Sequence, residues 1–186
     1  IDPDSVPDLC ANHCTLKVYG LYNNKPGARV RALGVVHVFG NMADMPRLLD
    51  IARRYKLILI EDATEALGTR YTAGPLAGKA AGTMGDIGCY SFNGNKIMTT
   101  GAGGFVGSNH ADWAEHAKHL STQAKADMLQ FLHDEVGYNY RMTNVQACLG
   151  LAQLERLEGF VETKIARYDQ YNAAVDGVLG LRILPF

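Results

Sequence analysis

Residues 30–62 constrain the fold of this chain more than any other segment does. The run Val30–Phe39 is near-continuously apolar toward its end, which is typical of a strand in a buried parallel sheet. Asp44 then has the character of a helix N-cap, Pro46 suits the first turn, and apolar side chains follow at helical spacing. A second apolar run, Lys56–Glu61, completes a strand–helix–strand unit whose length fits a right-handed crossover between parallel strands.

The rest of the chain extends this pattern. Residues 1–28 are loop-rich, and alternation at Thr15–Tyr22 predicts a short strand or hairpin. After residue 62 we expect a short helix Ala63–Leu67, a Gly-rich loop Gly68–Gly85, a strand ending at Phe92 and a short antiparallel strand Gly103–Gly107. Helices are then expected at Ala111–Leu120 and over Thr143–Asp176, with a break or cap near Gly159. The sequence therefore predicts an α/β fold with a mostly parallel sheet flanked by helices, and ligands at the carboxyl ends of its strands.

Composition excludes several classes of function. The 186 residues carry a net charge of −1, so no basic field favours nucleic acid, and the longest apolar runs are too short to cross a membrane. The cysteines lack CxxC spacing and the density of a disulfide scaffold. Cys10 and Cys14 flank His13, but no second ligand pair follows at zinc-site spacing, so we expect no metal and reduced, cytoplasmic thiols.

The segment Gly88–Gly104 holds most of the functional information. A short apolar strand runs into a single lysine, Lys96, and then into a Thr/Gly-rich turn. Lysine is costly to hold away from water, so it usually occupies solvated helix faces rather than this position. The preceding strand ends in acid, at Glu61 and Asp62. An amine and a carboxylate at adjacent strand ends suit pyridoxal phosphate (PLP), whose aldehyde and ring nitrogen need those two groups.

Four ordered motifs carry a family resemblance: Val36–Asn41, Glu61–Gly68, Ser91–Lys96 and Gly137–Thr143. With them the chain, from about residue 29 onward, resembles the DegT/DnrJ/EryC1/StrS family of PLP-dependent sugar aminotransferases. The resemblance implies the large domain of a fold-type I aminotransferase. The Ser91–Lys96 run is most similar to enzymes that aminate C4 of UDP-linked 4-keto-6-deoxy-N-acetylhexosamines.

The resemblance implies a role for each matching residue. Lys96 corresponds to the family's Schiff-base lysine, and Asp62 to the carboxylate that pairs with the pyridine nitrogen. Glu65 occupies the position near the phenolic oxygen of the cofactor, and Ser91 that of a hydroxyl donor to its phosphate. Asn139 matches an asparagine that reaches the phosphate of the other subunit across a dimer interface.

Structural interpretations compete with several of these roles. Lys96 is alternatively an exposed lysine after a strand. Asp62 is alternatively the N-cap of the expected helix Ala63–Leu67, and Glu65 is alternatively an acidic residue in the first turn of that helix. Asn139 is alternatively a turn asparagine. The roles of Asn93, which replaces a histidine common in relatives, and of Arg141 stay open; for His37 we favour a packed, hydrogen-bonded position over a direct role.

The sequence also departs from the family pattern. Ala102 stands where relatives often carry Glu or Gly, and the family's N-terminal phosphate-binding loop and ring-stacking aromatic residue have no match. The chain begins at Ile1 and ends in a strand-like run at Phe186. We therefore expect an internal piece of a longer protein: residues 1–186 as part of the PLP-binding large domain, incomplete at both ends, with 144–186 leading toward a C-terminal small domain.

The implied function is PLP-dependent transfer of an amino group, from glutamate, to the keto carbon of a nucleotide-linked deoxy sugar. The implied protein is a homodimer with a shared active site, and this piece alone is expected to be inactive. A sugar-dehydrating branch of the family carries histidine in place of the lysine, so Lys96 argues against it. A truncated or degenerate module without catalysis remains the alternative. A dinucleotide-binding domain is disfavoured because no G-x-G-x-x-G follows a strand.

Overall fold

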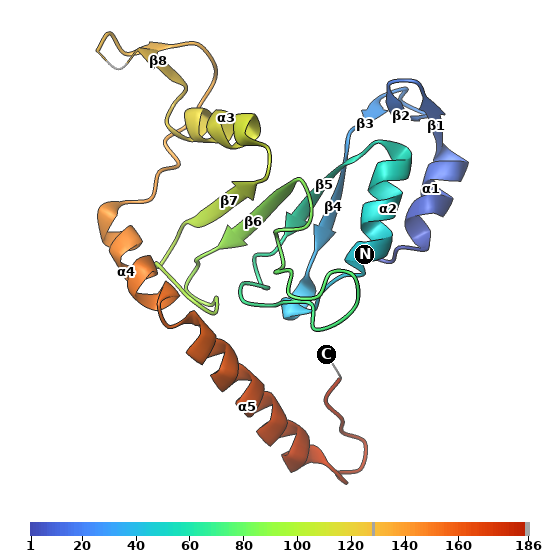
Figure 1. Cartoon of the computed structure of the whole chain (residues 1–186), viewed down its shortest axis with the longest axis vertical. Coiled ribbons are helices and arrows are strands. Elements are labelled where there is room, and N and C mark those ends of the chain that lie inside the picture. The colour runs from blue at the N-terminus through green and yellow to red at the C-terminus, as the bar shows by residue number, and fades with distance from the viewer. Residues whose placement is uncertain (128, 185–186) are drawn as a thin grey trace.

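A four-stranded sheet forms the centre of the molecule (Figure 1). The computed structural model describes residues 1–127 and 129–184. The strands lie in the order β4 (Ala32–Val36), β5 (Ile58–Asp62), β6 (Ile87–Ser91) and β7 (Gly104–Ser108). β4, β5 and β6 are parallel, and β7 runs antiparallel to β6. The α/β prediction, with a mostly parallel sheet and an antiparallel strand after the lysine loop, is confirmed.

Helix α2 (Met45–Tyr55) connects β4 to β5 and covers one face of the sheet (Figure 1). Its first turn forms as predicted: the Asp44 carboxylate accepts a hydrogen bond of 3.3 Å from the Arg47 backbone N–H. The helix ends at Tyr55, and the C-cap residue Lys56 has a left-handed backbone. Its buried side chains pack with strand residues into the main core, which includes Val35, Met45, Leu48, Ile51 and Leu59.

The N-terminal region contains more regular structure than the sequence predicts. Helix α1 (Ser5–His13) precedes a three-stranded antiparallel sheet of β1 (Cys14–Lys17), β2 (Gly20–Asn23) and β3 (Arg29–Val30). The hairpin prediction is confirmed, whereas the loop prediction for the first residues is wrong. Val6 and Cys10, one helical turn apart, are buried in the main core, and this burial stabilises a helix that has weak local signals.

The single strand predicted over Val30–Phe39 is wrong. β3 belongs to the N-terminal sheet, β4 ends at Val36, and a 3-10 helix, η1 (Val38–Gly40), follows. The backbone N–H of His37 still donates to Asp62 at 3.0 Å, but Phe39 adopts a left-handed φ of 55°. The apolar run therefore continues past the point where strand geometry ends, because the chain must turn over the sheet edge.

The predicted helix Ala63–Leu67 does not form. Two successive turns replace it, closed by hydrogen bonds of 3.0 Å from Ala66 N–H to Ala63 and from Thr69 N–H to Ala66. The side chains of Ala63 and Ala66 are buried in a small second core. Asp62 accepts from the Thr64 N–H at 3.1 Å, so it stabilises a turn rather than a helix.

The C-terminal region is a chain of helices with one hairpin. α3 (Ala111–Ser121) forms as predicted, and a hairpin of β8 (Lys125–Asp127) and β9 (Leu132–His133) follows it. The last helix is two helices, α4 (Asn144–Leu154) and α5 (Leu157–Val175).

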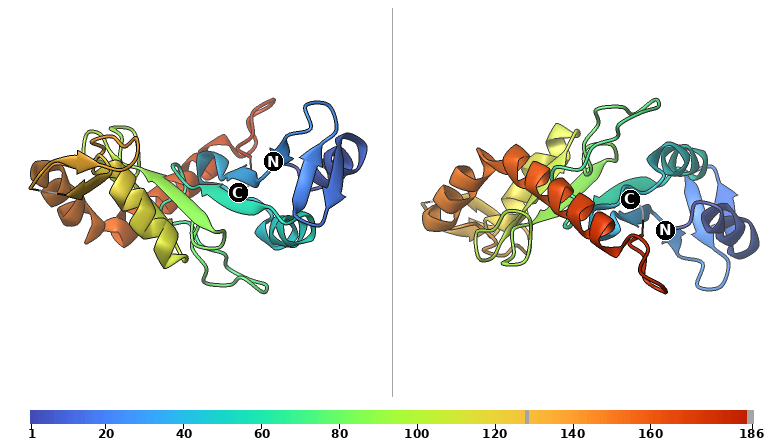
Figure 2. Two further views of the ribbon diagram at one scale, coloured as in Figure 1. Left: turned by 90° about the horizontal axis from the view of Figure 1, so that it is seen from above. Right: turned by 90° about the horizontal axis from the view of Figure 1, so that it is seen from below.

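α4 starts where predicted, with a capping box between Thr143 and Gln146. The break falls at Glu155 and Arg156 rather than at Gly159. Tertiary contacts explain the difference: the end of α4 bonds to the loop after β6, whereas the start of α5 packs at Gly68. The views from above and below show α5 crossing the region of the sheet's lower edge (Figure 2). The assignment of residues 144–186 as a lead into a small domain stays a prediction.

Gly88 allows the loop before β6 to cross that strand. A Cβ atom at this position would overlap the backbone carbonyl of Gly82. We expect Gly88→Ala to lower the free energy of unfolding by about 1–3 kcal/mol, because backbone rather than a flexible side chain must move. Urea denaturation measures the effect. Gly34→Ala is the matched strand control, since nothing lies within 4 Å of its Cβ position. Equal losses in the two variants would contradict the close approach.

Candidate active site

Three strand ends meet at one edge of the sheet, the lower edge in Figure 1. Since β4, β5 and β6 are parallel, His37, Asp62 and Ser91 follow or end adjacent strands at this edge. Asp62 lies opposite Cys89 in the sheet register, so Ser91 is two residues further along the same strand face. Burial, and then the charge of Asp62, raise the pKa of the Cys89 thiol. Topology thus brings Asp62 and Ser91 to one edge, as predicted.

Lys96 lies on a loop that closes on itself directly after β6. The Phe92 carbonyl accepts hydrogen bonds of 3.0 Å from both the Thr100 N–H and the Thr99 hydroxyl. The Lys96 N–H donates to Asn93 at 3.1 Å within the loop. The Lys96 side chain is 16% exposed, which does not fit the alternative of a fully solvated lysine after a strand.

Glu65 connects the lysine loop to the turn after β4. Its Oε1 lies 3.6 Å from Nζ of Lys96, and its Oε2 accepts a 2.8 Å hydrogen bond from the Phe39 N–H. The alternative of a first-turn helix acid is wrong, because residues 63–67 form turns. The carboxylate instead bridges two loops at the sheet edge. Phe39, which has a left-handed backbone and is 81% exposed, was not among the sequence candidates.

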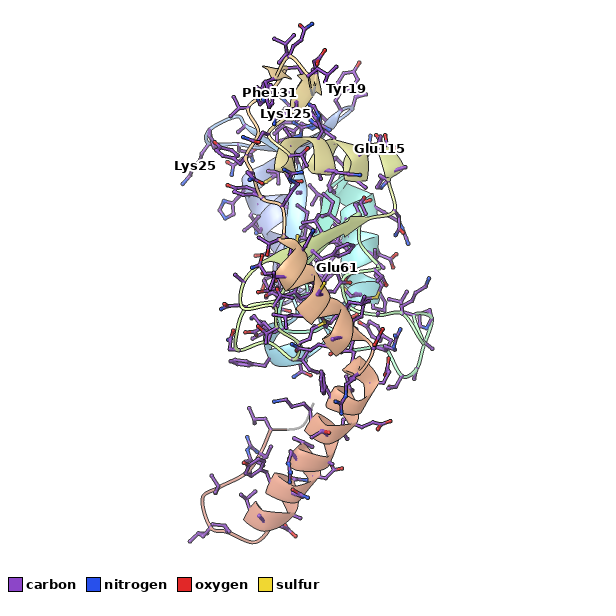
Figure 3. The ribbon with its side chains drawn as sticks, turned by 90° about the vertical axis from the view of Figure 1, so that its left-hand side faces the viewer. Tyr19, Lys25, Glu61, Glu115, Lys125 and Phe131 are labelled. Carbon is purple, nitrogen blue, oxygen red and sulfur yellow. The ribbon has the colours of Figure 1, made fainter. Side chains whose placement is uncertain are left out.

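A fully buried pair, His37 and Glu61, lies immediately beneath this edge. His37 Nδ1 accepts from the Ala43 N–H at 3.2 Å, so Nε2 carries the hydrogen and donates to Glu61 Oε2 at 2.9 Å. The packed, hydrogen-bonded position favoured for His37 is confirmed. Figure 3 labels Glu61 in the body of the molecule, far from the hairpin that carries Lys125 and Phe131.

The Glu61 carboxylate also binds the Gly-rich loop. It accepts from the backbone N–H groups of Gly82 at 2.8 Å, Met84 at 2.6 Å, and Gly85. Burial acts to raise the pKa of Glu61, but the hydrogen bonds from His37 and these N–H groups outweigh it and hold the pKa below its ordinary value. Sequence reasoning assigned Glu61 no role of its own. The alternation of side chains along a strand could have indicated its separate role. Glu61 and Asp62 are neighbours on one strand, so their side chains point to opposite faces of the sheet.

Asn139 and Arg141 are not bonded to the site residues at this edge in the part of the chain that the structure describes. Asn139 is exposed on the connection between the hairpin and α4, its backbone pairs with Thr122, and its Oδ1 accepts from the Arg141 N–H at 3.4 Å. This geometry fits the turn-asparagine alternative within one chain. In the described residues, neither side chain has a hydrogen bond or ion pair with Asp62, Ser91 or Lys96.

The donor set at the edge fits PLP. Asp62 accepts a hydrogen bond through Oδ1, and within the described structure its Oδ2 accepts none. Ser91 Oγ accepts from the Asn93 N–H at 3.3 Å, and among the described residues its own hydrogen has no acceptor. A half-buried carboxylate oxygen, a hydroxyl donor and a shielded amine are therefore available for a ring nitrogen, a phosphate and an aldehyde.

Metal-ligating groups cluster elsewhere, on the hairpin side of α3. His119, Asp134 and Glu135 present ligand atoms within 4.8 Å of one another. These groups are already hydrogen-bonded, His119 with Asp134 at 2.7 Å and His116 with Glu135 at 2.9 Å. These pairs fasten the hairpin to α3. Cys10 and Cys14 are both buried and free.

Comparison with known proteins identifies the family. Residues 25–186 match the DegT/DnrJ/EryC1/StrS aminotransferase family, and the chain belongs to this family. Within the described residues, no helix is sufficiently long and apolar to span a bilayer.

Among similar proteins, GDP-perosamine synthase of Escherichia coli O157:H7 is 39% identical over 151 residues, which are 81% of this chain and 40% of that protein. UDP-4-amino-4,6-dideoxy-N-acetyl-beta-L-altrosamine transaminase of Campylobacter jejuni is 34% identical over 142 residues, 75% of this chain and 36% of that protein. The crystal structure of the aminotransferase TlmJ from Streptoalloteichus hindustanus superimposes with a TM-score of 0.78 at 30% identity, over 86% of this chain and 42% of that one. The chain thus spans about 40% of the length of the relatives it matches.

Proposed function

We propose that this protein is a PLP-dependent aminotransferase that transfers an amino group to the keto carbon of a nucleotide-linked deoxy sugar. The observation that carries the proposal is the shielded Lys96 amine, on the loop that follows β6, at the sheet edge where Asp62 and Ser91 end neighbouring strands. Family membership supports it, since the family and the TlmJ structure are named as aminotransferases and the Campylobacter jejuni relative as a transaminase.

Each site residue then has a defined task. Bound PLP supplies an electron sink for negative charge on the carbon next to the transferred nitrogen. Lys96 Nζ binds the aldehyde and moves the proton that amino transfer requires. The Asp62 carboxylate favours the protonated ring nitrogen, because an opposite charge nearby stabilises a cation. The Ser91 hydroxyl donates to the phosphate.

Glu65 holds Lys96 in place through its second oxygen. Because the Phe39 N–H fixes Oε2, Oε1 stays directed at the lysine amine, 3.6 Å away. The task proposed for Glu65 at the phenolic oxygen of the cofactor is compatible with this position. Asn139 is proposed to act in the partner subunit's site of a homodimer, since among the described residues of its own chain it makes no hydrogen bond with Lys96. A cytoplasmic location, glutamate as donor and the homodimer are parts of the proposal.

Two observations bear on the nucleotide of the substrate. The Ser91–Lys96 run favours a UDP-linked sugar, whereas the E. coli relative is named for a GDP-linked product. Both fit a proposal for nucleotide-linked keto sugars as a class.

The test uses the longest natural form of the protein, loaded with PLP and supplied with glutamate. Separate reactions receive a GDP-linked 4-keto-6-deoxyhexose and a UDP-linked 4-keto-6-deoxy-N-acetylhexosamine, and mass spectrometry identifies the sugar product. We expect an aminated sugar in at least one reaction. A deoxygenated sugar would assign the protein to the dehydrating branch. No product from a folded, PLP-loaded protein would favour a module without catalysis.

A further inference from the structure

Gln153 on α4 binds the lysine loop through both ends of its side-chain amide. Oε1 accepts a 2.9 Å hydrogen bond from the Thr99 N–H, and Nε2 donates a 2.7 Å hydrogen bond to the Thr99 carbonyl. The two residues are 54 positions apart in sequence. A single side chain thus satisfies both backbone groups of a residue three positions after Lys96, as a neighbouring strand would.

The two legs of this loop are supported differently. The leg that enters the loop is strand β6, which is fixed by β5 and β7. The leg that leaves it, residues 97–103, belongs to no strand. It is held by the hydrogen bonds with Phe92, by a bridge between Gly101 and Asn93, and by α4.

Helix α4 supports the leaving leg by packing as well as by hydrogen bonds. Met98 and Thr100 are 3% and 4% exposed. Gly150, one turn before Gln153, lies so close that a Cβ atom there would be 3.0 Å from Thr100 Cγ2. The absence of a side chain at residue 150 therefore lets the helix approach closely enough for the Gln153 amide to reach Thr99.

We infer that Gln153 is a positioning residue that fixes Lys96 Nζ relative to Asp62 and Ser91. The inference rests on the proposed function. Loss of both hydrogen bonds loosens the leaving leg, and Lys96 then samples positions away from the carboxylate and hydroxyl more often. A displacement of about 1 Å at a reacting group lowers the rate by about 10²-fold.

The chain offers a matched control on the same helix. Gln146 lies two turns before Gln153, and its side chain serves the capping box with Thr143. Gln146→Ala weakens α4 without removing a contact to the lysine loop. A positioning role and a general loss of helix stability are therefore separable.

The first measurement is hydrogen exchange in the longest natural form of the protein without cofactor. We expect Gln153→Ala to speed exchange of the Lys96 and Thr99 amides by about tenfold, as loss of ordinary hydrogen bonds predicts, and Gln146→Ala to leave them unchanged. Gln153→Glu keeps the acceptor and loses the donor, so its exchange should lie between those of the wild type and Gln153→Ala. Equal effects from Gln146→Ala would overturn the inference.

The second measurement concerns the reaction itself. With PLP bound, Gln153→Ala should lower kcat by about 10²-fold while KM for the sugar changes little, because both polar ends of the Gln153 amide are bonded to Thr99. Faster exchange with an unchanged kcat would overturn the positioning role and leave the proposed function intact. If the wild-type protein transfers no amino group, the proposed function fails, and the positioning role fails with it, whatever exchange shows about the loop.

Discussion

Replacing Lys96 by alanine is expected to abolish amino transfer, with kcat lowered by about 10⁴-fold. The variant loses both the amine that binds the cofactor aldehyde and the group that moves the proton. The neighbouring Glu65 cannot substitute, since a carboxylate does not condense with an aldehyde. Lys96→Arg is expected to be equally inactive, although it keeps a cation beside Glu65, because a guanidinium stays protonated.

Borohydride reduction of the PLP-treated protein, followed by peptide mapping, tests directly whether the Lys96 amine binds the cofactor aldehyde. We expect a pyridoxyl adduct on the peptide that carries Lys96. Lys79→Ala is the matched control, because this exposed lysine lies on the Gly-rich loop outside the strand ends. An adduct at another lysine, or full activity in Lys96→Ala, would rule out the proposed mechanism.

Replacing Glu61 by alanine is expected to produce the largest loss of stability, about 3–5 kcal/mol. The carboxylate is fully buried, and its removal leaves the His37 Nε2–H and the N–H groups of Gly82, Met84 and Gly85 without their acceptor. Urea denaturation measures the loss. Asp50→Ala removes an exposed carboxylate that pairs with Arg53, so it should change stability by less than about 1 kcal/mol. Comparable losses in both variants would contradict the buried network.

The lowered pKa of Glu61 predicts how the stability of the folded protein changes in acid. The pKa of Glu61 is lower in the folded protein than its ordinary value of 4.5, because the hydrogen bonds outweigh burial. The stabilisation is therefore fully present above pH 4.5 and is lost as the pH falls through the folded-state pKa. The difference in unfolding free energy between wild type and Glu61→Gln should narrow from pH 7 to acid pH. A constant difference over this range would show that Glu61 does not titrate with unfolding.

The sequence alone determined the features that depend on neighbouring residues. Asp44 and Thr143 cap α2 and α4 because an N-cap needs only a side-chain oxygen two or three residues before a free N–H. The strand–helix–strand unit follows from apolar periodicity, and the antiparallel β7 from the glycines that allow a tight reversal. Lys96 and Asp62 could be named because each directly follows or ends an apolar strand, and four ordered motifs gave each a role.

Tertiary structure alone decided the features that depend on distant partners. α1 forms because Val6 and Cys10 are buried against core residues that come from other parts of the chain. Residues 63–67 form turns instead of a helix because two alanines are buried in the second core, and Glu65 is directed to Phe39 and Lys96. Gln153 meets Thr99 across 54 residues, a contact that no local pattern contains. Local hydrogen bonds and apolar periodicity depend on residues that are neighbours in the sequence. Burial and long-range hydrogen bonds form only when the chain has folded.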